Sequence, residues 1–95
     1  MKTRDIIIGN KKAVGFEISL PEAVLLLAKG KKGFVMCGYL DIAAAEKFEH
    51  AAAIVRNIKN LDGLLKGKVT DVTSKAKRLG VHVGMIGKEA LEKFV

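Results

Sequence analysis

The chain has 95 residues, a net charge of +7 and a hydrophobic content of 49%. This length suits one domain, residues 1–95, and the longest apolar stretches are far shorter than the roughly 20 residues of a transmembrane helix. One cysteine excludes an intramolecular disulfide, and the amino-terminal residues lack the apolar run of a signal peptide. We therefore expect a cytoplasmic protein in a reducing compartment, with no membrane partner.

The amino-terminal residues predict a β-hairpin. Three consecutive isoleucines, which favour strands, are followed by the turn-forming sequence Gly-Asn-Lys-Lys. In the second strand Val14, Phe16 and Ile18 alternate with small or polar residues. A period of two predicts that these three side chains share one buried face.

The next segments predict a helix, a strand and a second helix. Residues 19–33 predict a short helix that Ser19 would cap and Gly30 would end. Residues 33–38 are wholly apolar, which is typical of a short strand buried on both faces. Residues 39–50 then predict a helix that begins at Asp41 or at the turn before it.

The second half of the chain continues this mixture of strands and helices. It predicts a strand at 52–58, helices at 61–66 and 68–80, a short strand at 81–83 and a helix at 87–95. Asn60 suits the start of the first of these helices, and Gly67 and Gly80 suit helix ends. The fold class is therefore α/β, with a mixed α+β arrangement as the alternative: a single domain with a mixed sheet of about four to five strands, four to five short helices and an N-terminal β-hairpin.

Cys37 is the first candidate for chemistry, because it ends a predicted central strand just before a glycine turn and a helix. Open α/β sheets bind ligands at the carboxyl ends of their strands, and the start of a helix favours a thiolate. Cys37 and Asp41 are thus candidate catalytic residues, and Gly38, which the sharp turn requires, is a candidate ligand- or anion-binding residue. The alternatives are that Cys37 packs as a small apolar side chain and that Asp41 caps the helix.

A second candidate site is the start of the last helix. Gly84, Gly87 and Lys88 precede or open this helix, whose free N–H groups together with a lysine would bind an anion. The spacing is not that of a phosphate-binding loop. The glycines would serve equally well as ordinary turn residues.

The positive charge raises the question of nucleic acid. Three of the 17 basic residues are arginines, and the lysines are spread along the chain. The sequence has no tryptophan, one tyrosine and four phenylalanines, so no stacking platform is evident. We expect a solvated lysine surface that binds polyanions without sequence specificity.

Other chemistry has little support in the sequence. One cysteine and two scattered histidines form no metal-binding pattern, and no serine lies in a nucleophile-elbow context. The sequence names no cofactor and leaves open whether the protein is an enzyme.

Two stretches resemble the YunC-like family, which is classed as a domain of unknown function. Residues 33–41, "GFVMCGYLD", match a Met-Cys-Gly-x-Leu-Asp pattern, and residues 79–94, "LGVHVGMIGKEALEKF", match a Leu-Gly-Ile/Val-x-Val-Gly-Met-x-Gly-x-Glu-Ala-Leu ending. "NLDGLL" at 60–65 lies between them. The resemblance implies a small stand-alone α/β protein whose motifs include Cys37, Gly38, Asp41, Gly84 and Gly87. It implies no activity, substrate or cofactor.

Three functional hypotheses follow. The high apolar content of so small a chain favours a homo-oligomer, and the first hypothesis adds a small-molecule or thiol site around Cys37. The second is an oligomeric structural or interaction module without catalysis. The third is nonspecific binding of nucleic acid or another polyanion through surface lysines.

Overall fold

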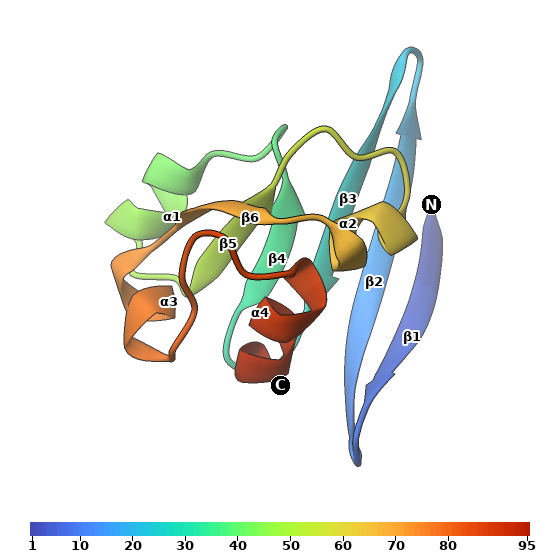
Figure 1. Ribbon diagram of the computed structural model, residues 1–95. Helices are drawn as coiled ribbons and strands as arrows, with labels where there is room; N and C mark the ends of the chain where they lie inside the picture. The colour runs from blue at the N-terminus through green and yellow to red at the C-terminus, as the bar shows by residue number, and fades with distance from the viewer.

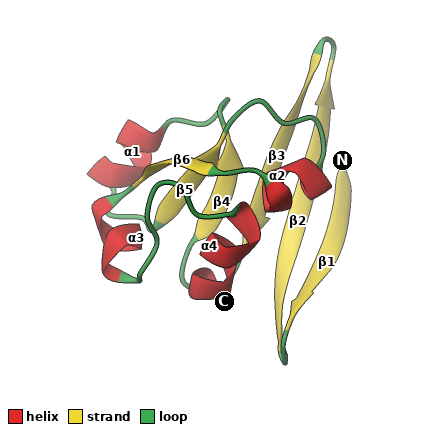
Figure 2. Ribbon diagram, viewed as in Figure 1, coloured by secondary structure: helices red, strands yellow, loops and turns green.

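A computed structural model describes residues 1–95 as a six-stranded mixed sheet with four short helices (Figures 1 and 2). The strands are β1 (Lys2–Ile8), β2 (Lys11–Leu20), β3 (Ala23–Lys29), β4 (Phe34–Cys37), β5 (Ala52–Val55) and β6 (Val69–Val72). The helices are α1 (Ile42–Lys47), α2 (Leu61–Lys66), α3 (Ser74–Arg78) and α4 (Gly87–Phe94). The predicted fold class is confirmed, with six strands in place of four to five.

The strands lie in the sheet in chain order, and all but one pair are antiparallel. The exception is β4 with β5, which run parallel because α1 carries the chain back across the sheet. The predicted amino-terminal hairpin is confirmed as β1 and β2, joined at Gly9 and Asn10. The carboxyl ends of β4 and β5 therefore lie side by side at one end of the sheet.

The helix predicted at 19–33 is wrong, because Ala23–Lys29 forms β3. Its alternate side chains face both sides of the sheet, with Leu26 and Ala28 fully buried on one side and Leu27 packed on the other. A strand that is apolar on both faces has the composition of a buried helix, so periodicity alone does not separate the two. Gly30 lies in the turn to β4 and ends no helix.

The long helix predicted at 68–80 is also wrong in its first half. Val69–Val72 forms β6, and only Ser74–Arg78 is helical. Thr73 separates them: its buried hydroxyl oxygen accepts from Ala52 N at 3.0 Å and from Ala76 N at 3.3 Å, which joins β5 to the start of α3. Residues 81–83 form no strand, although the next residues pair with β6 through Gly84 N and Met85 O.

The predicted helix starts are confirmed at two positions. The Asp41 carboxylate accepts from Ala43 N at 2.9 Å, and the Asn60 side chain accepts from Gly63 N at 2.7 Å. Each bond satisfies one of the N–H groups that a helix start leaves free. These are local interactions between neighbours in the chain, which is why the sequence predicts them.

The main core lies on the face of the sheet that α2, α3 and α4 cover. It holds 18 buried side chains, and its largest members include Leu26, Val35, Leu64, Leu91 and Phe94. A smaller cluster lies under α1 on the other face: Met36, Ala45, Ala52 and Ile54. The sheet is thus covered on both faces only around β4 and β5.

The outer part of the second face has no helix above it. Val14, Phe16 and Ile18 do share this face, but the helices that contact β2 and β3, α2 and α4, lie on the opposite one. Val14 and Phe16 are half-buried and Ile18 is 36% exposed in the single chain. The expectation that all three side chains are buried is therefore wrong for the chain by itself. Figure 1 also shows the tip of the β2–β3 hairpin extending past the body of the molecule.

Candidate functional site: a cavity at the strand ends

A cavity of about 300 Å³ opens at the carboxyl ends of β4 and β5. Seven residues line it: Val24, Cys37, Gly38, Tyr39, Arg56, Asn57 and Ile58. They come from β3, from the end of β4 and the turn that follows it, and from the turn that follows β5. This is the end of the parallel pair at which open α/β sheets bind their ligands.

The cavity exists because β3 and β4 separate at Cys37. The two strands pair through Leu27 and Met36, and one position further the pairing stops. There Leu26 N donates to Cys37 Sγ at 3.3 Å instead of to a carbonyl oxygen. Cys37 is 3% exposed, so its sulfur both fills the core and satisfies a buried N–H group where the ladder ends.

Arg56 supplies the positive charge of the cavity. Its Nε and Nη2 donate to Asp71 Oδ2 at 3.2 and 3.0 Å, and Thr70 Oγ1 donates to the same oxygen at 2.9 Å. The Nη1 atom makes no hydrogen bond within the protein. A Cβ at Gly38 would lie 3.1 Å from this Nη1, so the missing side chain gives the guanidinium its place beside the turn.

The turn after β5 brings a polar group to the same rim. Asn57 has φ +59°, a left-handed conformation that few residues other than glycine adopt. Asparagine is among the residues that adopt this conformation most readily after glycine, so it marks a tight turn directly after Arg56.

The structure brings together only part of the predicted site. Cys37 and Gly38 line the cavity, whereas Asp41 caps α1 and is not among the lining residues. Arg56 and Asn57, which the sequence reasoning missed, complete it. An arginine and an asparagine directly after an apolar strand were the signal that could have indicated them.

The second predicted group lies apart from this cavity. Cys37 pairs with Val55 and Val55 with Val69, and Gly84 lies beyond Val69. Three N–H groups of this segment have acceptors in the protein: Gly84 N donates to Val69 O, Gly87 N to Gly67 O, and Ile86 N to Glu89 Oε1. A Cβ at Gly87 would overlap the Leu64 carbonyl group, so this glycine lets α4 approach α2. Lys88 is exposed.

The lining of the cavity suits an anionic ligand. A guanidinium, an amide and the phenol of Tyr39 offer hydrogen-bond donors, while Val24 and Ile58 are apolar. Neither histidine nor carboxylate is among the lining residues. No three His, Cys, Asp or Glu side chains lie grouped as metal ligands, and none of the four helices is long and apolar enough to span a membrane.

Fold and site together define a class: a small single-domain protein with a mixed sheet and a cavity at the ends of its one parallel strand pair. Residues 36–94 match the model of a family described as a domain of unknown function (DUF1805). The chain is 31% identical to the uncharacterized protein YunC of Bacillus subtilis (strain 168) over 94 residues, which is 95% of this chain and 93% of the relative. The chain belongs to the DUF1805 family, as its motifs predict.

A solved structure agrees with this assignment. The crystal structure of TA1206 from Thermoplasma acidophilum, described as a protein of unknown function, is similar with a TM-score of 0.93 and 33% sequence identity. The likeness covers 99% of this chain and 92% of that one. The fold is therefore shared along the whole length, including the amino-terminal hairpins that precede the matched family region.

Proposed function

We propose that the protein is a homo-oligomer that binds a small anionic molecule in the cavity at the ends of β4 and β5. The observation that supports this function is Arg56, whose Nη1 is unpaired at a 300 Å³ cavity while its other nitrogens are held by Asp71. A guanidinium fixed on one side can present its remaining donors to a carboxylate or phosphate at little entropic cost. Val24 and Ile58 would contact the apolar part of the ligand.

Ligand binding is tested by thermal unfolding with a panel of small carboxylates and inorganic phosphate. A compound that binds the folded protein raises the unfolding temperature as its concentration rises. Arg56→Ala should abolish the shift, and Arg4→Ala is the matched control because Arg4 pairs with Asp62 at 3.2 Å on a different surface. Equal shifts in wild type and Arg56→Ala would refute the role of this arginine.

The thiol hypothesis attaches to the same cavity. Cys37 lines it, so a thiolate could attack an acyl carbon of a bound ligand, displace the ligand's leaving group and form a thioester that water then cleaves, if the sulfur reached that carbon. Its burial and its bond with Leu26 N favour binding over nucleophilic chemistry. A variant with Cys37→Ser separates the two, because a binding site would keep its affinity and a thiol enzyme would lose turnover.

The oligomer is proposed to form between two copies of this chain through the uncovered face of β2 and β3. Phe16 pairs across the strands with Leu27, and Ile18 pairs with Leu25, so apolar side chains form a continuous surface. With the neighbouring strand β1 included in the contact, three strands about 4.8 Å apart and up to ten residues long span roughly 15 Å by 30 Å. That face supplies more than half of the roughly 800 Å² that each partner of a standard interface buries.

Light scattering and sedimentation test this interface. Ile18→Lys places a charge in the centre of the proposed contact and should shift the protein to monomer. Val83→Lys is the control, since Val83 is 57% exposed on the other side of the molecule. A wild type that stays monomeric at high concentration, or an Ile18→Lys variant that stays oligomeric, would exclude this surface.

A further inference from the structure

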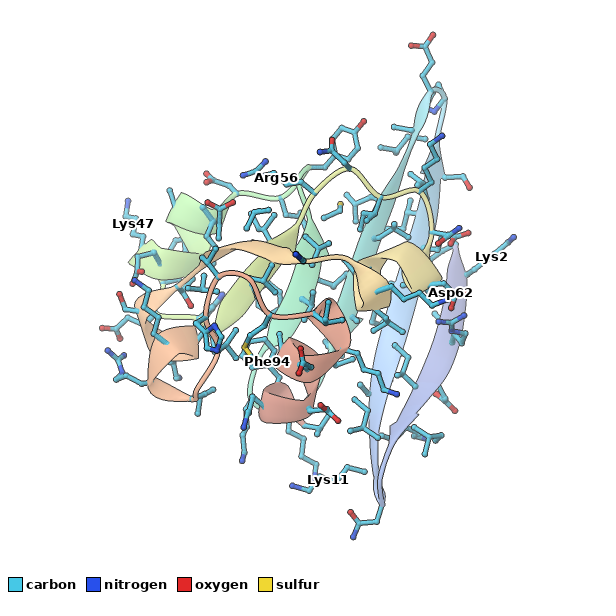
Figure 3. The ribbon with its side chains drawn as sticks, viewed as in Figure 1. Lys2, Lys11, Lys47, Arg56, Asp62 and Phe94 are labelled. Carbon is cyan, nitrogen blue, oxygen red and sulfur yellow. The ribbon has the colours of Figure 1, made fainter.

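A second hollow lies at the opposite end of the sheet from the cavity. It has a volume of about 260 Å³ and lies where β4 and β5 begin, between the β3–β4 turn and the turn after α1. Its lining includes four lysines, Lys29, Lys31, Lys32 and Lys75, and the rings of Phe34 and His50. Lys11 lines an adjoining hollow together with Lys31 and Lys32, and Figure 3 shows Lys11 at the opposite end of the molecule from Arg56.

Phe34 and His50 line this hollow, and Phe48 joins them in lining an adjoining apolar hollow beside α1. The centroids of Phe34 and His50 lie 6.1 Å apart in an edge-on contact, and those of Phe48 and His50 lie 6.3 Å apart. Phe48 is 66% exposed, so its ring is not part of the core. Phe34 lies well before Phe48 and His50 in the sequence, which explains why the sequence alone gives no sign of a stacking platform.

Backbone hydrogen bonds hold these rings in place. Phe34 N donates to Ala51 O at 3.0 Å, and His50 N donates to Ala45 O at 2.8 Å. Glu49 between the rings has φ +59°, which turns the chain back toward β5. A Cβ at Gly33 would overlap the Ala51 carbonyl group, so the two turns are pressed together. The backbone that carries Phe34 and His50 is thus held by the fold.

The lysines around the rings form one positive surface. Lys29, Lys31, Lys32 and Lys75 make no ion pair with a carboxylate within 4.0 Å. Lys31 and Lys32 also line an adjoining hollow of about 440 Å³ with Lys11 and Lys12. Glu49 is the acidic side chain among the lining residues of the two hollows, and Lys12 pairs with Asp5 at 3.6 Å. The six lysines therefore exceed these two carboxylates.

We infer that this end of the molecule binds single-stranded nucleic acid. Lysines flanking aromatic rings are the combination that such ligands need, because phosphates bind the ammonium groups while unpaired bases stack on the rings. The phosphates of a duplex would contact the lysines, but its bases would not stack on the rings, since they are already stacked on one another. The surface lies at the other end of the sheet from the anion cavity, so the two proposals stand or fall separately.

Fluorescence anisotropy with a labelled oligothymidylate tests the inference. Four phosphate contacts give a slope of about −3 for the logarithm of the association constant against the logarithm of the salt concentration. Lys31→Ala with Lys32→Ala should reduce this slope by about 1.4, since each single-strand contact contributes about 0.7. Phe48→Ala should weaken binding roughly 5- to 150-fold and leave the slope unchanged, because it removes stacking only.

The matched control is the double variant Lys59→Ala and Lys66→Ala, which removes the same charge from exposed positions next to α2. It should keep most of the affinity and the same slope. Light scattering on each variant checks that the oligomeric state is unchanged. The inference fails if the oligothymidylate does not bind at low salt, or if wild type and Phe48→Ala bind it with equal affinity. It also fails if the control variant loses as much affinity as the variant with Lys31→Ala and Lys32→Ala, because diffuse positive charge would then account for the binding. A duplex of the same length bound as tightly as the single strand would also contradict it.

Discussion

Replacing Cys37 tests the local arrangement from which the cavity arises. The Sγ atom lies in the main core and accepts from Leu26 N at 3.3 Å at the point where β3 and β4 separate. Cys37→Ala removes this sulfur atom, which is slightly larger than a methylene group. Losing the burial of such a group costs about 1 kcal/mol of hydrophobic transfer free energy. It also leaves the buried Leu26 N–H without an acceptor, which adds about 1 kcal/mol because sulfur is a weak acceptor.

The sum is a loss of about 2 kcal/mol in the free energy of unfolding. For a domain of this size it corresponds to a fall of roughly 8–16 °C in the unfolding temperature. Urea denaturation followed by circular dichroism measures the loss as a shift of the midpoint by about 1–2 M. Wild type and variant must be compared at one protein concentration, because assembly would add to the apparent stability.

Cys37→Ser separates the two contributions. The serine hydroxyl can still accept from Leu26 N, so it should restore part of the stability that the alanine variant loses. If the serine variant is less stable than the alanine variant, Cys37 acts only as an apolar core residue. The hydrogen bond would then not be the reason that the strands part at this position.

Three further predictions concern the same thiol, the motif glycines and one carboxylate. Native Cys37 should react with iodoacetamide far more slowly than unfolded protein, because it is 3% exposed; fast native reaction at a lower pH than a model thiol would instead support a thiolate site. Gly87→Ala should cost more than about 3 kcal/mol in urea unfolding, since its Cβ would overlap a carbonyl of α2, whereas Gly84→Ala, with φ +98° and open space, should cost about 1–2 kcal/mol. Hydrogen bonds from the Ser74 backbone and then from its hydroxyl hold the pKa of Glu46 below its ordinary value of 4.5. This pair therefore contributes stability above pH 4.5 that is lost as the pH falls through the folded pKa, and Glu46→Gln should flatten that acid dependence; an unchanged profile would contradict it.

Local signals predicted the elements that depend on neighbours in the chain. Asp41 and Asn60 cap helices through bonds to residues two and three positions ahead, and the β1–β2 hairpin follows from a turn of adjacent residues. The two missed strands gave no such local signal: Ala23–Lys29 is apolar on both faces, so its composition is also that of a buried helix, and Val69–Val72 pairs with a strand much earlier in the chain. Ala23–Lys29 is a strand because β2 and β4 lie on either side of it, and Val69–Val72 because β5 does.

The candidate sites divide in the same way. The run from the apolar strand through Cys37 and Gly38 indicated a strand-end site, because a strand, its last residue and its turn are contiguous. Arg56 joins that site only because β4 and β5 are parallel neighbours, which brings two turns from distant parts of the chain to one end of the sheet. The lysine and ring surface needs the turn before Phe34 to meet the turn after α1.

By itself the sequence determined the family, the mixed composition of strands and helices, and the motif residues at the end of β4. Those properties depend on residue types and short spacings, which are present before the chain folds. Only the tertiary structure decided which apolar strand faces are covered by helices, that Arg56 and Cys37 line the same cavity, and which lysines surround the aromatic rings. Such contacts join residues far apart in sequence, and their geometry is set by the pairing and packing of the whole sheet.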